Sequence, residues 1–357
     1  MLNTSDFIDR LIECGYTHIC AVPCSFAKNI INEVINNNSI KYVPCASEAV
    51  ACSIAVGLKM SYKQPIVIVQ SSGLTNMGSC ITSLLKPYNV KFSIIVSWRT
   101  YKEGDSEIQH KHLAKKLPTL IHAYGYKHLI LDNQNIDNAI YQINNCNHTF
   151  TICLLLKDSF SEIKLKKEYE LDLSNFIQRS HFLTILNKKF KNSDLLFIGT
   201  TGNTAREMYH FMPNTNNFYM AGNMGGALSL GLGASIGGRK VIVCGGDAEF
   251  VMHMGGLATA GRYNNNNIDL TYILFDNKQN KSTGGQNTYQ DHLSYIDIAK
   301  NSNFITNNNS INTLDDFEQK IENNKRKNGL RFLHVECGTD DEATRPPIQV
   351  IKVNKFE

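Results

Sequence analysis

The sequence predicts an α/β protein with two domains, each a mostly parallel sheet flanked by helices. Three observations support this fold class. The chain has 357 residues, which exceeds one ordinary domain and fits two. Short apolar runs alternate with amphipathic stretches along its length, a pattern typical of parallel strands joined by helices. Its 42% hydrophobic and 19% charged residues are the composition of a globular protein with sizeable cores.

In the first half, four apolar runs are predicted to be buried strands: residues 18–22, 66–70, 92–97 and 151–155. Residues 46–60 are mostly small and apolar, which predicts a helix that packs closely against its neighbours. A charged stretch follows the last strand and breaks the pattern. We therefore expect a first domain at 1–160, a linker at 161–177 and a second domain at 178–357.

The second half repeats the alternation. Its predicted strands are residues 195–199, 241–244, 270–275 and 332–336, and its clearest predicted helices are residues 226–237 and 253–263. The two halves thus have the same plan, although no sequence repeat relates them.

Composition also excludes several classes of function. No apolar run reaches the roughly 18–20 residues of a membrane-spanning helix, and the first residues lack the layout of a secretory signal. The formal charge of +4 is small, and no basic stripe with aromatic residues indicates nucleic-acid binding. The ten cysteines contain no Cys-x-x-Cys pair, so we expect buried free thiols in a reducing, cytoplasmic setting.

Polar residues follow two predicted strands of the second half. Gly-Gly-Asp-Ala-Glu occupies 245–249 and Asp-Asn-Lys-Gln occupies 276–279, so both emerge at the carboxyl edge of the sheet, where α/β ligand sites form. Asp247 and Asn277 supply hard oxygens suited to Mg²⁺. The glycine backbone and the helix N-terminus that follows suit a diphosphate. Taken alone, Gly-Gly-Asp is better interpreted as a tight turn with a helix cap, and Asn277 as another turn residue.

Glu48 is the one acid in the small, apolar segment 45–52 of the first half. Burial in such a segment raises the pKa of a carboxyl and keeps a proton available. Taken alone, Glu48 is better interpreted as a first-turn carboxylate that complements the helix dipole.

The joint spacing of these segments resembles that of thiamine-diphosphate-dependent enzymes, in which Gly-Asp-Gly precedes Asn-Asn or Asp-Asn by two dozen or more residues. Further segments are similar to the phosphonopyruvate decarboxylases, the compact two-domain branch of that family. They are Val-Pro-Cys-Ser-Phe at 22–26, Gln-Ser-Ser-Gly-Leu-Thr-Asn at 70–76, Ser-Trp-Arg at 97–99 with Gln-His at 109–110, and the stretch 276–286. The match extends from near residue 20 to near residue 350.

The resemblance implies thiamine diphosphate and Mg²⁺ as cofactors, on two thiamine-diphosphate-binding domains, the pyrimidine-binding one first and the diphosphate-binding one second. It implies Asp247, Asn277 and the backbone carbonyl of Gln279 as metal ligands. The implied cofactor-binding residues are Glu48, Ser72, Asn76, Gly222, Met224, Gly246, Asp247, Ala248 and Asn277. Met224 keeps the cofactor bent, unless it is simply a core methionine. Ala248 departs from the motif, whose third position is glycine.

In this chemistry Glu48 faces the pyrimidine nitrogen, and protonation of that ring lets the exocyclic amine remove the thiazolium proton. The implied reaction decarboxylates phosphonopyruvate to phosphonoacetaldehyde. A small 2-oxo acid with a second anionic group needs hydrogen-bond donors and positive charge, and the candidates are Ser25, Arg99, His110 and Arg345. His110 is equally a catalytic proton shuttle or a structural histidine.

Three alternatives stay open. A sulfopyruvate decarboxylase has the same chemistry, although that enzyme is commonly split over two chains. A carboligase passes the intermediate to an acceptor carbonyl, but usually carries a third domain. A non-catalytic relative has no need of Glu48, Asp247 and Asn277 together. The resemblance also implies a homodimer or larger assembly with active sites at the subunit interface, and neither nucleic acid nor membrane as a partner.

Overall fold

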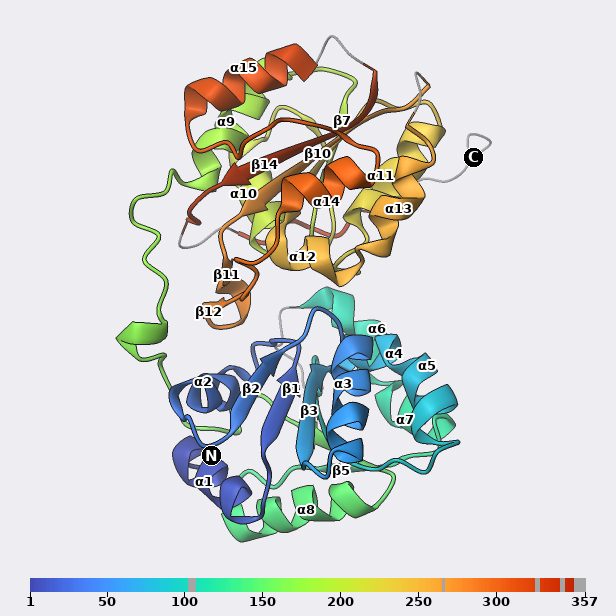
Figure 1. Ribbon diagram of the computed structural model, residues 1–357, viewed down its shortest axis with the longest axis vertical. Coiled ribbons are helices and arrows are strands. Elements are labelled where there is room, and N and C mark those ends of the chain that lie inside the picture. The colour runs from blue at the N-terminus through green and yellow to red at the C-terminus, as the bar shows by residue number, and fades with distance from the viewer. Residues whose placement is uncertain (102–106, 265–266, 325–327, 341–343, 350–357) are drawn as a thin grey trace. The chain divides into compact units, whose positions relative to one another are not determined.

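The computed structural model describes residues 1–101, 107–264, 267–324, 328–340 and 344–349. The chain forms two compact units. The first contains Met1–Glu170 and Ser282–Asn287, and the second contains Leu171–Lys281 and Thr288–Glu357. Each unit is an α/β sandwich with helices on both faces of a sheet (Figure 1), which confirms the predicted fold class.

The first unit is built on six parallel strands in the order β2-β1-β3-β4-β6-β5. The strands are β1 (His18–Ala21), β2 (Lys41–Pro44), β3 (Pro65–Gln70), β4 (Ser93–Ser97), β5 (Lys127–Ile130) and β6 (Thr151–Leu155).

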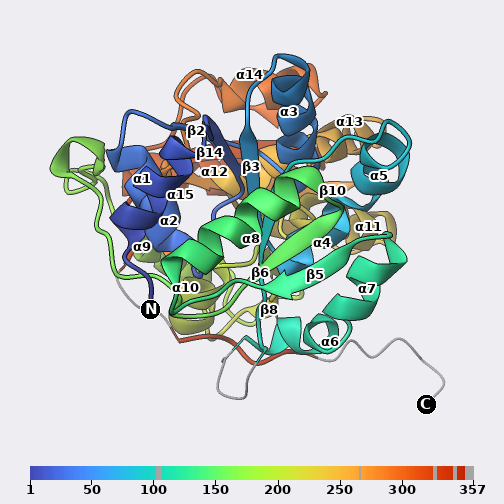
Figure 2. The ribbon, with the colours of Figure 1, turned by 90° about the horizontal axis from the view of Figure 1, so that it is seen from below.

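Helices cover both faces of this sheet, as Figure 2 shows from below. Side chains of α1 (Thr4–Glu13), α2 (Lys28–Asn36) and α8 (Ile136–His148) pack into one core. The other core is filled mainly from α3 (Glu48–Met60), α4 (Ser71–Asn76), the π-helical turn η1 (Ile81–Leu85) and α7 (Leu117–Ala123). Shorter helical segments are α5 (Gly78–Cys80), η2 (Ile108–His110), α6 (Lys111–Ala114) and η3 (Lys167–Tyr169).

The two cores explain why the central strands are apolar along their whole length. In β3, Ile66 and Ile68 point into the first core, whereas Val67 and Val69 point into the second. Successive side chains of a strand alternate between the faces of the sheet. A parallel sheet covered on both faces therefore needs apolar residues at every central position.

The second unit repeats the strand order of the first. Its six-stranded parallel sheet has the order β8-β7-β9-β10-β14-β13. When the strands of each six-stranded sheet are numbered along the chain, both sheets have the order 2-1-3-4-6-5. The strands are β7 (Leu196–Gly199), β8 (Asn216–Tyr219), β9 (Val241–Gly246), β10 (Asp269–Asp276), β13 (Ile305–Thr306) and β14 (Gly329–Glu336).

Two helical layers again enclose two cores. One layer consists of α9 (Arg179–Lys189), α10 (Asn203–Phe211) and α15 (Leu314–Asn324). The other consists of α11 (Ala227–Ile236), α12 (Asp247–Met252), α13 (Gly255–Gly261) and α14 (Tyr295–Asn301). After β10 the chain forms a small two-stranded sheet, β11 (Gln279–Asn280) with β12 (Gln286–Asn287), around the turn η4 (Lys281–Thr283).

The eight predicted strands are all present, as are the predicted helices, with shifted ends. The helix predicted at 46–60 begins at Glu48, where the Ser47 side chain caps it. The helix predicted at 253–263 is α13, and a separate helix, α12, precedes it. Four strands of the two six-stranded sheets were not predicted, β2, β5, β8 and β13, and neither were the two short strands β11 and β12.

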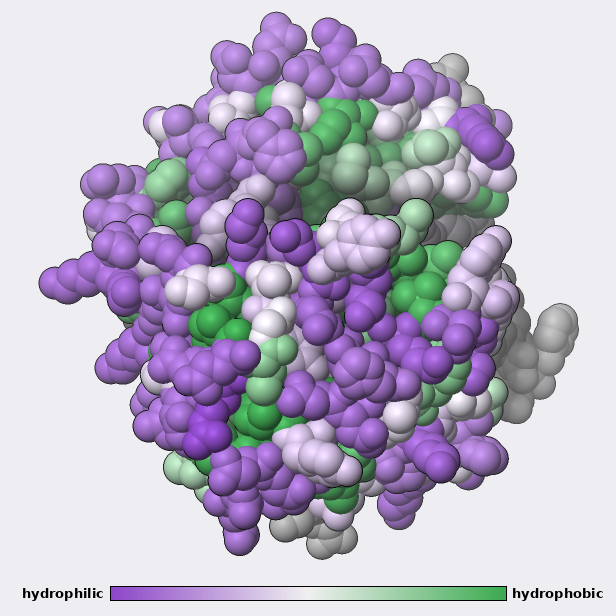
Figure 3. Space-filling view, turned by 60° about the horizontal axis from the view of Figure 1, so that its bottom comes forward, coloured by the Kyte–Doolittle hydropathy of each residue, from purple (hydrophilic) through white to green (hydrophobic). Residues whose placement is uncertain are grey.

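The ten cysteines carry free thiols, and eight of them are buried, as expected. The face of the molecule in Figure 3 carries mainly hydrophilic residues, with the apolar ones in separate groups. Within the described ranges, none of the helices combines the length and the apolar character that crossing a membrane requires.

Candidate active site

The strand order places a topological switch point in each unit. In the first unit β1 and β3 are neighbours, and the helices that follow them, α2 and α4, lie on opposite faces. In the second unit β7 and β9 are neighbours, and α10 and α12 diverge in the same way. Such a point leaves a crevice at the carboxyl ends of the strands, where α/β proteins bind ligands.

Glu48 lies beside the C-terminal end of α4 in the first unit. Its side chain is 2% exposed, and its Oε2 accepts a hydrogen bond of 2.9 Å from the Asn76 amide. A Cβ at Gly73 would overlap the Glu48 carboxyl group, so only glycine leaves room for this acid. The structure therefore brings together two predicted cofactor-binding residues, and Ser72 lies half-buried on the same helix α4.

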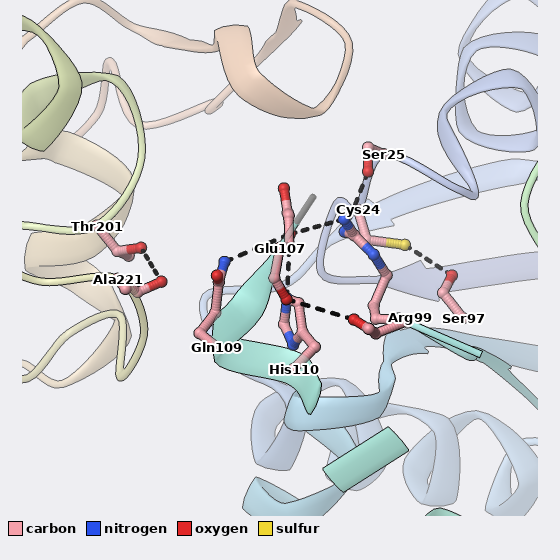
Figure 4. Close-up of polar contacts among 10 residues, drawn as sticks. Cys24, Ser25, Ser97, Arg99, Glu107, Gln109, His110, Thr201 and Ala221 are labelled. Atoms are coloured by element: carbon pink, nitrogen blue, oxygen red, sulfur yellow. Dashed lines mark hydrogen bonds and ion pairs between the residues drawn. The ribbon is translucent and has the colours of Figure 1, made fainter. Parts of the chain in front are cut away.

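Three of the four predicted substrate-binding residues also meet in the first unit (Figure 4). Arg99 follows β4 and is 5% exposed, and its guanidinium donates to Ser25 Oγ at 3.1 Å. The same guanidinium lies 2.6 Å from Glu107 Oε2 and stacks 4.4 Å from the ring centroid of Phe26. His110 Nε2 lies 3.1 Å from that Glu107 oxygen.

Glu107 is the residue of this cluster that the sequence did not reveal. It is the carboxylate to which Arg99 and His110 both turn. A buried arginine that stacks on a ring and pairs with a carboxylate is held in one orientation. The cluster thus holds a buried guanidinium together with its internal carboxylate partner.

The second unit brings the predicted metal ligands to the ends of adjacent strands. Asp247 follows β9 and Asn277 follows β10, and both are buried. The side-chain amide of Asn277 lies 3.1 Å from the Gln279 carbonyl oxygen, so these two groups converge. Asp247 Oδ2 accepts a hydrogen bond of 3.1 Å from Thr288 Oγ1.

The pKa of Asp247 is raised to about 7, mainly by burial and also by repulsion from the neighbouring Asp276. Hydrogen bonds from the Ala248 backbone and from Thr288 act in the opposite direction. A buried carboxyl beside a second acid is a poor site for negative charge unless a cation is bound. Mg²⁺ is such a cation, because carboxylate, amide and carbonyl oxygens are its usual ligands.

The surroundings of Gly246 fit the diphosphate of the cofactor. A Cβ built on Gly246 meets no described atom within 4 Å, so there is open space beside its Cα atom. Ala248, at the position of the third motif glycine, lies within α12 and has no left-handed backbone angle. Its methyl group is therefore compatible with the turn.

Gly222 and Met224 lie in the loop that leads into α11. Both are half-buried, so Met224 is not a core methionine. Asn223 and Gly225 have positive φ angles, 58° and 92°, which turn the chain sharply on both sides of Met224. Before the loop, Thr201 Oγ1 donates to the Ala221 carbonyl at 3.1 Å.

Arg345, the fourth predicted substrate-binding residue, is exposed in the second unit on a segment without helix or strand. Its role stays a prediction. Sequence reasoning also missed Glu249 and Tyr272, which are buried beside the Gly246–Asp247 turn. The sequence held one signal for Glu249, namely an acid two residues after Asp247 inside an otherwise apolar helix.

Among the described residues, no group of three His, Cys, Asp or Glu side chains that would hold a metal was found. The predicted Asp247 site does not depend on such a group, because two of its three predicted ligands are an amide and a backbone carbonyl. The residues present fit thiamine diphosphate with Mg²⁺. They are the buried acid Glu48 beside Gly73, the backbone at Gly246, and the oxygen atoms of Asp247, Asn277 and the Gln279 carbonyl.

Comparison with known families agrees with this geometry. Residues 3–115 match the thiamine pyrophosphate enzyme N-terminal TPP binding domain, and residues 198–335 match the C-terminal TPP binding domain.

Three curated relatives cover different shares of the chain. The phosphonopyruvate decarboxylase of Streptomyces viridochromogenes is 25% identical over 99% of this chain and 93% of its own length. The sulfopyruvate decarboxylase of Methanosarcina acetivorans is 25% identical over 92% of this chain and 89% of its length. The sulfopyruvate decarboxylase subunit beta of Methanothermobacter thermautotrophicus is 37% identical over 40% of this chain and 73% of its length.

The family matches span both units, and the relatives share one type of chemistry. The chain therefore belongs to the thiamine-diphosphate-dependent 2-oxo acid decarboxylases, which are carbon–carbon lyases with thiamine diphosphate as cofactor.

Proposed function

We propose that this enzyme decarboxylates 3-phosphonopyruvate to phosphonoacetaldehyde and CO₂, as a step of phosphonate biosynthesis, with Mg²⁺ as the second cofactor. The observation that carries the proposal is the similarity to phosphonopyruvate decarboxylases over nearly the whole chain, at 25% and 26% identity for the two Streptomyces relatives. The cluster around Arg99 supports it, because a phosphonate needs a positively charged, donor-rich site.

Each unit contributes its own residues. When bound, thiamine diphosphate supplies the electron sink that accepts the electron pair left as CO₂ departs. Glu48 would face the pyrimidine ring of the bound cofactor, and Asn76 keeps its carboxyl group oriented by a hydrogen bond of 2.9 Å. Asp247, Asn277 and the Gln279 carbonyl hold Mg²⁺, and the Gly246 backbone lies against the diphosphate.

Arg99, Ser25 and His110 bind the anionic group of the substrate. Glu107 already neutralises part of the charge of Arg99 at 2.6 Å, so the substrate competes with an internal carboxylate. A doubly charged phosphonate competes more strongly than a neutral methyl group, which gives the cluster selectivity against pyruvate. Arg345 is a further candidate for the same anionic group.

Sulfopyruvate is the second candidate substrate. The higher local identity, 37%, is to a sulfopyruvate decarboxylase subunit. Chain organisation does not separate the two enzymes: subunit relatives are split over two chains, whereas the Methanosarcina acetivorans relative aligns with this chain over 92% of it. Phosphonate and sulfonate are both tetrahedral oxyanions, so only a substrate comparison decides between them.

We also propose a homodimer or larger assembly in which subunits meet at the active site. On α3, the helix that begins with Glu48, Val50 and Ile54 are 41% and 36% exposed. On the same face, a Cβ at Gly57 would meet open space. A glycine inside an exposed helix costs about 1 kcal/mol, and a closely packed second helix gives it a purpose. The buried free thiols support a cytoplasmic location.

The deciding experiment assays the purified enzyme with thiamine diphosphate and Mg²⁺ against phosphonopyruvate, sulfopyruvate and pyruvate, with detection of CO₂ and aldehyde. We expect the wild-type enzyme to prefer phosphonopyruvate and the Glu48→Gln variant to lose this activity. Preference for sulfopyruvate would refute the substrate and keep the reaction class. Transfer of the product to an acceptor carbonyl in place of aldehyde release would indicate a carboligase.

A further inference from the structure

Glu249 is a buried carboxylate that the proposed reaction does not use. It lies in the first turn of α12, two residues after Asp247, and is 2% exposed. Its Oε2 accepts a hydrogen bond from the hydroxyl group of Tyr272 on β10. Its Oε1 accepts one from the backbone N–H of Ala227 at 3.3 Å. Burying a carboxylate without a paired cation is costly, so its presence calls for a reason.

The neighbouring glycine is shaped to this arrangement. A Cβ at Gly245 would overlap the Tyr272 hydroxyl group, so a side chain at that position would push the tyrosine away from Glu249. Tyr272 is itself 1% exposed. Gly245 therefore leaves room for the same hydroxyl group that bonds to Glu249.

Ala227 begins α11 and directly follows the loop that carries Met224. Through its bond to Ala227, Glu249 joins this loop to the Gly246–Asp247 turn. A second contact from the same segment supports the link, because the His253 ring packs so closely on Gly225 that a Cβ there would lie 2.8 Å from the ring.

The first unit has a contact at the equivalent place. There, Glu48 at the start of the helix after the second strand accepts a bond from Asn76 on the helix after the third strand. In the second unit the same two helices are joined by Glu249 and Ala227, with the carboxylate on the other partner. In both units, a carboxylate thus joins the helix after the second strand to the helix after the third strand. In the first unit that carboxylate is Glu48, the proposed catalytic acid.

We infer that Glu249 is a positioning residue, which fixes the Met224 loop relative to the Gly246–Asp247 turn and so sets how the thiazole part of the cofactor lies with respect to its diphosphate. The inference rests on the proposed placement of the diphosphate at this turn. Glu249 does not touch the cofactor; it acts through Ala227 and the loop.

The test uses the full-length enzyme and two ligands measured by titration calorimetry in excess Mg²⁺. Thiamine diphosphate needs both the turn and the loop, whereas inorganic pyrophosphate needs only the turn. Glu249→Gln keeps the size of the side chain but loses one acceptor. Tyr272→Phe removes the donor that orients Glu249. Tyr295→Phe is the matched control, because Tyr295 is also buried and its hydroxyl group donates to Gln290 Oε1 at 2.6 Å.

We expect Glu249→Gln to weaken thiamine diphosphate binding about tenfold, which corresponds to ~1.4 kcal/mol, and to change pyrophosphate binding less than about twofold. Tyr272→Phe is expected to act in the same direction with a smaller effect, and the control to change neither affinity. If Glu249→Gln fails to fold, Tyr272→Phe decides alone.

Equal losses for both ligands would show a general structural role and overturn the inference, as would unchanged thiamine diphosphate binding in both variants. These outcomes do not depend on the substrate. If the wild-type enzyme binds thiamine diphosphate but turns over neither phosphonopyruvate nor sulfopyruvate, the proposed function fails while the positioning result stands.

Discussion

Gly73 offers a sharp test of the catalytic acid, because its replacement by alanine displaces Glu48 without removing any group from it. A Cβ at position 73 would lie 2.7 Å from both Cδ and Cγ of Glu48. Ordinary contact begins at 3.4 Å and the Glu48 Oε1 atom lies closer still, so the side chain has to retreat by at least about 0.7 Å. It is buried and bonded to Asn76, and therefore cannot simply swing into solvent.

A misplacement on the order of 1 Å can reduce the rate by about 100-fold, and we expect a loss of this size in kcat/KM of Gly73→Ala. Stability should change little. Alanine gains about 1 kcal/mol over glycine in a helix, and overpacking costs about 1–3 kcal/mol. The net loss in the free energy of unfolding, measured by urea denaturation, is thus expected to stay within about 2 kcal/mol.

Gly233→Ala is the matched control, because Gly233 lies in α11 and a Cβ there meets no described atom within 4 Å. It should keep full activity. Decarboxylation by Gly73→Ala within threefold of the wild-type rate would refute the reasoning, since the Glu48 carboxyl group would then not need its observed position.

Three further predictions address the second unit, the anion site and the assembly. Glu207→Gln should lower the free energy of unfolding by about 3–5 kcal/mol in urea, because it breaks a buried pair that Arg179 makes through two bonds of 2.6 and 2.8 Å; a loss below 1 kcal/mol would contradict this. Arg99→Lys should raise KM for phosphonopyruvate about tenfold and leave KM for pyruvate unchanged, since lysine cannot reproduce the planar fork; equal changes for both substrates would argue against an anion site. Ile54→Glu should yield monomers in light scattering with unchanged circular dichroism, and an unchanged mass would remove α3 from the interface.

The fold was predictable where strands are central. Residues 151–155 were predicted without error as β6, because all five side chains are buried. In the two six-stranded sheets, the four strands that were missed are the edges: β2 and β5, β8 and β13. In β2 and β5 no side chain is fully buried. An edge strand needs no continuous apolar run, so a prediction based on apolar runs does not find it.

The candidate site was predictable where chemistry imposes a residue type at a fixed spacing. Asp247 and Asn277 follow neighbouring strands, so their meeting is a consequence of topology. Glu107 and Glu249 were missed because their partners are set by three-dimensional packing: Arg99 turns to Glu107, and Tyr272 lies 23 positions from Glu249. No periodicity in the sequence carries that information.

The repeated strand order has an evolutionary meaning. Six parallel strands can be arranged in many orders, and finding 2-1-3-4-6-5 twice in one chain is expected if an ancestral module was duplicated and fused. The two units differ at the same junction, where Glu48 stands at the head of α3 and Ala227 at the head of its counterpart α11. A duplicated module of this kind would thus carry a carboxyl group at one of two equivalent places and only a backbone amide at the other.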